Sequence, residues 1–170
     1  MSKKNYLFQE QPPTQERKKN HCKVSLNDLS IVKPVTINQS KFFKAYEKSD
    51  FFILSGYPGT GKSFISLYKA LEDALTDSRL KVIIVRSAVP SRDVGALPGD
   101  LNEKLEVYEL PYKKICADLF NRADAYDRLK EQKVIQFVST SYLRSLTFDD
   151  SIIIADEFQN MTFEEIDTVA

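Results

Sequence analysis

Apolar and polar residues along this chain follow two different periods, and together they predict strands separated by helices. Four short apolar runs have the length of strands, at about 51–55, 81–85, 134–138 and 152–155, and the run at 81–85 is also β-branched, as in a strand buried on both faces. After the first run, residues 61–76 place apolar side chains at helical spacing on one face, namely Phe64, Leu67, Tyr68, Leu71 and Leu75. Alternating strands and helices predict an α/β fold, with a parallel sheet covered by helices.

Weaker patterns complete the predicted domain. A short helix through Phe42 and Tyr46 can be capped by Asn38 or Ser40. Further helices are predicted from Asp100 to about Glu109, from Tyr112 to Ala125, and through Phe163, Ile166 and Val169. Residues 1–33 are polar and include Pro12-Pro13 and a basic patch at 17–19, which is typical of a flexible arm. The predicted organisation is an arm over 1–33 followed by one domain over 34–170.

Composition narrows the function classes. The chain has 170 residues, 42% hydrophobic, and its 24 basic and 24 acidic residues cancel, so net charge offers no general argument for nucleic acid. Cys22 and Cys116 are far apart and His21 is the only histidine, which disfavours a metal cluster or a disulfide framework and fits a reducing compartment. No apolar run reaches membrane-spanning length, and the N-terminus lacks the apolar core of a signal peptide. We expect a cytoplasmic protein.

The most specific motif follows the first predicted strand. Gly56-Tyr57-Pro58-Gly59-Thr60-Gly61-Lys62-Ser63 fits the G-x-x-x-x-G-K-[ST] phosphate-binding loop and opens the predicted helix. Glycines let the backbone approach an anion, and backbone N–H groups at a helix N-terminus then attract it. Lys62 would reach the β- and γ-phosphates, and the Ser63 hydroxyl would join the shell of Mg²⁺. This motif predicts binding of a nucleoside triphosphate.

A second motif ends the last predicted strand. Residues 152–155 are apolar and are followed by Asp156 and Glu157, which is a Walker B pattern. Asp156 would hold Mg²⁺ directly or through water, and Glu157 would orient and polarise the attacking water. Because successive strand residues point to opposite faces, both acids can serve only if the strand ends or bends there.

Three arginines are weaker candidates. Arg86 ends the second predicted strand on the ligand edge of the sheet, and Arg92 lies in the loop that follows. Arg144, between the last two strands, could stabilise charge on the γ-phosphate as an arginine finger. An ordinary surface arginine remains an open alternative at each position.

Several segments together resemble one family, the PhoH-like ATPases of bacteria and phages, which are related to superfamily 1 helicase motor domains. The resemblance rests on the phosphate loop, on Arg86-Ser-Ala-Val, on Gly95-Ala-Leu-Pro-Gly-Asp-Leu-Asn-Glu-Lys104, on Tyr142-Leu-Arg and on Asp156-Glu-Phe-Gln-Asn160. It covers about 34–170. It implies a RecA-like P-loop NTPase fold, a three-layer αβα sandwich, with ATP and Mg²⁺ as ligands. It also implies, less directly, action on RNA or DNA and assembly into homo-oligomeric rings.

The resemblance carries further roles over by position. Gln39 matches the glutamine that reads adenine in helicase-like relatives, where a side-chain amide can pair with N6 and N7. Gln159 matches the glutamine that couples the γ-phosphate state to the rest of the domain. The loop at 86–90 lies where relatives grip single-stranded backbone. A plain surface glutamine or loop residue remains the alternative for each of these positions.

The chain also departs from the family pattern. The usual Arg-Gly-Arg-Thr reads Arg144-Ser145-Leu146-Thr147, and Phe158 replaces a small residue. The chain ends at Ala170 inside a predicted helix, whereas the family continues into another strand, so we expect an incomplete domain whose phosphate-loop strand lies at a sheet edge.

The sequence therefore predicts a Mg²⁺-dependent P-loop ATPase. Two alternatives stay open. One is a small-molecule kinase, for which Arg122 and Arg128 are too few to form a lid cluster. The other is a nucleotide-binding module without turnover.

Overall fold

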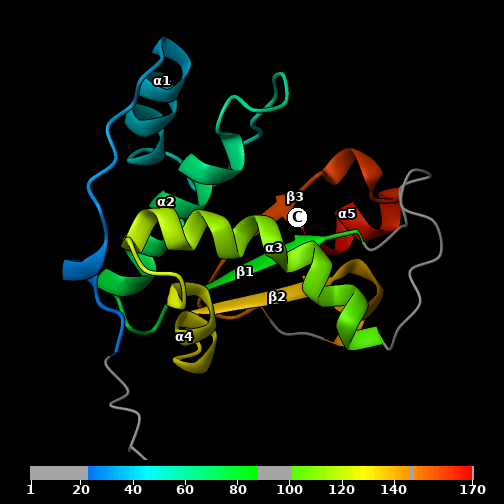
Figure 1. Ribbon diagram of the computed structural model, residues 1–170. Coiled ribbons are helices and arrows are strands. Elements are labelled where there is room, and N and C mark those ends of the chain that lie inside the picture. The colour runs from blue at the N-terminus through cyan, green and yellow to red at the C-terminus, as the bar shows by residue number, and fades with distance from the viewer. Residues whose placement is uncertain (1–22, 88–100, 146–147, 170) are drawn as a thin grey trace, which may run out of the picture.

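A three-stranded parallel sheet forms the centre of the domain, in the order β2-β1-β3 (Figure 1). The strands are β1 (Lys81–Arg86), β2 (Ile135–Ser139) and β3 (Ser151–Asp156). This is a computed structural model, which describes residues 23–87, 101–145 and 148–169, without the side chains of 101–104, 144 and 145. The predicted α/β class with a parallel sheet is confirmed, and the three later strands lie within one or two residues of their predicted places.

Helices cover both faces of the sheet and make three layers. The helices of the domain are α1 (Ile37–Tyr46), α2 (Lys62–Thr76), α3 (Leu101–Phe120), α4 (Ala125–Glu131) and α5 (Phe163–Val169), with short 3-10 turns η1 (Leu26–Asp28), η2 (Thr140–Ser145) and η3 (Phe158–Asn160). The larger core lies between the sheet and α2, α3 and α4, and the smaller one between the sheet and η2, Met161 and α5. Within the described residues, no helix is both long and apolar enough to cross a bilayer.

β1 lies at the centre of both cores. Its residues Val82 to Val85 are each at most 1% exposed. Val82 and Ile84 face the larger core, while Ile83 and Val85 face the smaller one, as the two-residue period of a strand requires. The prediction of a strand buried on both faces is confirmed.

α2 matches its predicted bounds and carries the phosphate loop at its N-terminus. Leu67 and Leu71 are almost fully buried in the larger core, and Phe64 and Leu75 are partly buried against it. Each fully buried leucine contributes roughly 1.5–3 kcal/mol relative to an exposed one. Packing on the sheet therefore fixes the start of α2.

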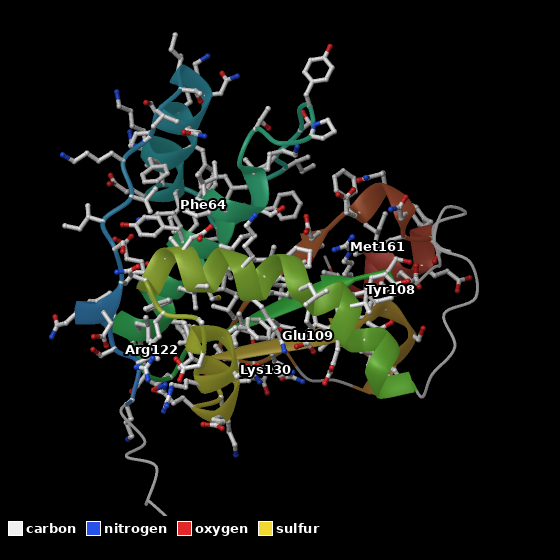
Figure 2. The ribbon with its side chains drawn as sticks, viewed as in Figure 1. Phe64, Tyr108, Glu109, Arg122, Lys130 and Met161 are labelled. Carbon is white, nitrogen blue, oxygen red and sulfur yellow. The ribbon has the colours of Figure 1, made fainter. Side chains whose placement is uncertain are left out.

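α3 corrects the sequence prediction, because one helix spans the region where two were expected. Pro111 lies inside α3 and removes one backbone hydrogen bond. Figure 1 shows α3 changing direction along its length, as expected of a helix that contains proline. The helix continues because buried Tyr112 and Cys116 follow the proline, and because Lys130 of α4 pairs with Glu109 at 2.9 Å (Figure 2). Asp100, its predicted cap, lies outside the described residues.

The strand predicted at 51–55 is wrong in this structure. The segment has no ladder partner among the described residues and lies apart from the sheet (Figure 1). Phe52 packs instead on α1, with ring centroids 5.4 Å from Phe42 and 5.5 Å from Tyr46. Phe51 and Ile53, which alternate with it, are 68% and 67% exposed. The aromatic contacts to a helix thus replace the expected burial within a sheet.

The N-terminal region also differs from expectation. Val24, placed in the flexible arm by composition, is 3% exposed in the larger core, and the Ser30 amide donates to the Leu119 carbonyl at 2.8 Å. Residues 23–33 therefore pack on the domain, and residues 1–22 lie outside the described ones. Thr36, rather than Asn38 or Ser40, caps α1, because its side-chain oxygen accepts a hydrogen bond from the backbone N–H of Gln39.

Two isoleucines test the position of the segment 51–55. We expect Ile84→Ala, in the core of β1, to lower the free energy of unfolding by about 2–5 kcal/mol. Ile53→Ala removes the same atoms from an exposed site and should change it by less than about 0.5 kcal/mol. Urea unfolding followed by circular dichroism measures both. Equal losses would mean that Ile53 is buried in a strand in solution.

Candidate active site

The phosphate loop folds back on its own lysine. Lys62 Nζ donates hydrogen bonds to the carbonyl oxygens of Gly56 and Tyr57, both at 2.9 Å. The Thr60 hydroxyl donates to the Tyr57 carbonyl at 2.9 Å and tightens the same turn. Pro58 and Gly59 form the exposed tip. The ammonium group therefore lies close to the loop and to the N-terminus of the 15-residue α2, where an anion is favoured.

Gly61 is the position where the loop most needs a glycine. Its φ of 82° and ψ of 18° lie in the left-handed region, immediately before α2. A Cβ added here would lie 3.4 Å from the side-chain nitrogen of Gln39. Backbone conformation and a close neighbour thus both favour the residue without a side chain.

Ser63 and Asp156 meet across the site although they are far apart in the sequence. The Ser63 hydroxyl donates to Asp156 Oδ1 at 3.1 Å. Two cis ligands of an octahedral Mg²⁺ at 2.0–2.1 Å are about 2.9 Å apart, so the spacing of these oxygens fits the ion. No cluster of three or more His, Cys, Asp or Glu side chains suited to a metal occurs in the described part of the chain. The other ligands of a Mg²⁺ ion here would be phosphate oxygens and water, as is usual for this ion.

β3 ends at Asp156, and the next residue turns sharply. Glu157 has φ 52° and ψ 39°, the left-handed region that few non-glycine residues adopt. The chain therefore bends after Asp156, as it must if Asp156 and Glu157 are both to face the site. The Gln159 side-chain amide donates a hydrogen bond to Glu157 Oε2, so these two candidate residues contact each other.

Gln39 lies against the phosphate loop. Its side-chain nitrogen donates to the Thr60 carbonyl at 3.2 Å, and its side-chain oxygen accepts from the Val35 amide at 2.8 Å. These contacts use one donor and one lone pair of the amide, which leaves one of each for a ligand. The structure thus brings Gln39 to the loop, and its reading of adenine stays a prediction.

The structure adds a residue that the sequence analysis missed. The Tyr112 hydroxyl donates to Asp156 Oδ2 at 2.7 Å, and the side chain is almost fully buried. Burial, followed by the nearby Asp156 charge, raises the pKa of Tyr112 well above its ordinary value, so the hydroxyl keeps its proton. The predicted helix break at 110–111 concealed it. Within one continuous helix, Tyr108 and Tyr112 are four residues apart and share a face.

Arg86 lies at the carboxyl edge of the sheet, as predicted. It ends β1 directly opposite Asp156 in the ladder, and its guanidinium carbon is 5.7 Å from the centroid of the Tyr108 ring. Figure 2 shows Tyr108 on α3. Residues 88–100, including Arg92, lie outside the described residues. Arg144 falls in η2, and its side chain is outside the described part of the structure.

Comparison with known proteins gives a consistent result. A family model described as PhoH-like protein matches residues 31–170. A PhoH-like protein of Bacillus subtilis is 34% identical over 128 residues, which are 75% of this chain and 40% of that protein. A PhoH-like protein of Mycobacterium leprae is 32% identical over 79% of this chain and 39% of its own length. Protein PhoH of Escherichia coli is 31% identical over 73% of this chain and 36% of its own length. The chain thus spans about two fifths of the curated relatives it matches.

The conformation of Glu157 can be tested through stability. Glu157→Gly and Glu157→Ala both remove the carboxylate and its contact with Gln159, and they differ only in the Cβ. Since a left-handed backbone costs a non-glycine residue about 1–2 kcal/mol, we expect the glycine variant to be more stable by about 1 kcal/mol. Chemical denaturation measures the difference. A more stable alanine variant would show that residue 157 is not left-handed in solution.

Proposed function

This chain belongs to the PhoH-like protein family, and on that basis we propose that it binds ATP with Mg²⁺ and hydrolyses it. The observation that carries the proposal is the contact of Ser63 with Asp156 at 3.1 Å. It joins the two motifs that a P-loop ATPase needs, one from the start of α2 and one from the end of β3. The spacing of the two oxygens suits neighbouring ligands of Mg²⁺.

The loop residues would hold the triphosphate. Backbone N–H groups of the turn and the N-terminus of α2 would bind phosphate oxygens. Lys62, now bonded to two loop carbonyls, would reach the β- and γ-phosphates. Ser63 and Asp156 would hold Mg²⁺, which when bound neutralises charge on the β- and γ-phosphate oxygens.

Glu157 would serve as the base for the attacking water. The water oxygen forms a bond to the γ-phosphorus, the bond to the ADP oxygen breaks, and a water proton moves to the Glu157 carboxylate. The left-handed turn directs this carboxylate away from the line of β3, and its contact with Gln159 gives it a defined position. The contact also supports a role for Gln159 in sensing the γ-phosphate. Arg144 would stabilise charge on the transferred group.

A second acid next to Asp156 favours hydrolysis over transfer to a small molecule. A kinase would need arginines free to close over the phosphates. Arg122 and Arg128 instead pair with Asp124, at 2.5 Å and 2.6 Å. Their contacts tie the region between α3 and α4 together and support a structural role for both.

We further propose that turnover is coupled to single-stranded RNA or DNA. The support is the family resemblance and the place of Arg86 at the carboxyl edge, beside Asp156. A nucleic-acid backbone that binds Arg86 would therefore directly affect Asp156, the proposed Mg²⁺ ligand. Assembly into a homo-oligomeric ring stays a prediction from the resemblance.

Hydrolysis is tested by comparing wild type with Glu157→Gln. Because loss of a general base typically costs 10²–10⁴-fold, we expect phosphate release to fall by about 100-fold or more while binding of a fluorescent ATP analogue persists. EDTA should abolish turnover, and Lys62→Ala should weaken binding. The exposed Glu47→Gln serves as a matched control and should behave as wild type. Wild-type binding without any turnover would instead support a nucleotide-binding module.

Coupling to nucleic acid is tested in the same assay with single-stranded RNA or DNA at low salt, where electrostatic binding is strongest. We expect stimulation that declines as salt is raised and is reduced in Arg86→Gln. ATP turnover that ignores both polymers at low salt would contradict the coupling and leave the hydrolysis proposal intact.

A further inference from the structure

We propose that Tyr112 is a positioning residue for the metal-binding carboxylate, holding Asp156 so that one carboxylate oxygen stays turned toward Ser63. The inference deepens the proposed function and rests on it, since it concerns the same site. It assigns a task in the nucleotide site to α3, a helix that contains neither the phosphate loop nor the acidic motif.

The two oxygens of Asp156 have different partners. Oδ1 accepts from the Ser63 hydroxyl at 3.1 Å, and Oδ2 accepts from the Tyr112 hydroxyl at 2.7 Å. A carboxylate held at one oxygen by a fixed donor cannot rotate about its Cβ–Cγ bond without losing that hydrogen bond. Tyr112 thus reserves Oδ1, the oxygen beside Ser63, for the ion.

The direction of the tyrosine hydrogen bond is also determined. The Arg86 guanidinium lies beside the same hydroxyl, and it can only donate. The Asp156 carboxylate can only accept while it is charged. A hydroxyl between a donor and an acceptor gives its proton to the acceptor, so the tyrosine donates to Asp156.

The tyrosine itself is held rigidly. Its side chain is 1% exposed, and its ring centroid is 5.9 Å from that of Phe137 on β2. One turn earlier, the ring of Tyr108 lies under Arg86. The neighbouring Glu109, 6% exposed, pairs with Lys130 and fastens α3 to α4 (Figure 2). The hydroxyl therefore has little freedom to follow a carboxylate that moves.

Residues that orient a metal ligand from behind typically change metal affinity by 10–100-fold when removed. Tyr112→Phe deletes the hydroxyl and keeps the ring that fills the core. We expect it to raise the Mg²⁺ concentration that half-saturates ATP-analogue binding by about 10-fold. Affinity for the analogue in EDTA should stay unchanged, because the phosphate loop is untouched.

The experiment titrates Mg²⁺ into the 170-residue chain with a fluorescent ATP analogue, and thermal melting monitors the fold. Tyr126→Phe is the matched control. Tyr126 is a fully buried tyrosine of α4, and its ring lies near Lys130. Because Tyr126→Phe also removes one buried hydroxyl, but away from Asp156, it should leave the Mg²⁺ requirement at the wild-type value. In an Asp156→Asn background, Tyr112→Phe should raise the Mg²⁺ requirement no further, since it acts through that carboxylate.

Each other result overturns the inference. A wild-type Mg²⁺ requirement in Tyr112→Phe refutes positioning while leaving the proposed function standing. Equal weakening with and without Mg²⁺ would show a purely structural role, and additive effects in the Asp156→Asn background would show that Tyr112 acts elsewhere. Wild-type nucleotide binding that is indifferent to Mg²⁺ would overturn both this inference and the proposed function.

Discussion

The hydrogen bond between Ser63 and Asp156 is the contact on which the candidate site depends. Among the residues that the structure describes, the segment that leads into the phosphate loop pairs with no strand, so no ladder between them fixes the loop to the core. Its position comes from the packing of α2, from the contact of Gln39 with Thr60, and from Ser63 meeting the end of β3. The candidate nucleotide site is thus assembled by side chains from separate elements around a buried central strand.

Sequence reasoning succeeded where one local rule and the global fold agree. The run at 82–85 is apolar at every position, and only a strand buried on both faces suits it. It failed where tertiary contacts override local preference. Pro111 indicates a helix end, yet buried residues on either side keep α3 continuous. The apolar run at 51–55 indicates a strand, yet Phe52 packs against aromatic rings of α1.

The sequence predicts the motif residues of the candidate site but not the residues that hold them in position. Short motifs identify Lys62, Ser63 and Asp156 because their chemistry requires fixed residue types at fixed spacing. Tyr112 carries no such pattern, since any helix can present a tyrosine. Only the crossing of α3 over the end of the sheet brings its hydroxyl to the carboxylate. Supporting residues of this kind depend on topology, which a single sequence reveals least.

The separation of Ser63 from Asp156 also has a consequence for how the protein folds. Their contact spans 93 positions, and Asp156 lies at the end of β3, a strand that pairs with β1 in the folded domain. Closing so long a loop costs more chain entropy than forming local contacts within α2 or α3. Long-range contacts such as this one therefore form slowly. During synthesis the phosphate loop leaves the ribosome well before the acid it needs. A complete candidate site therefore marks a chain whose sheet has finished assembling.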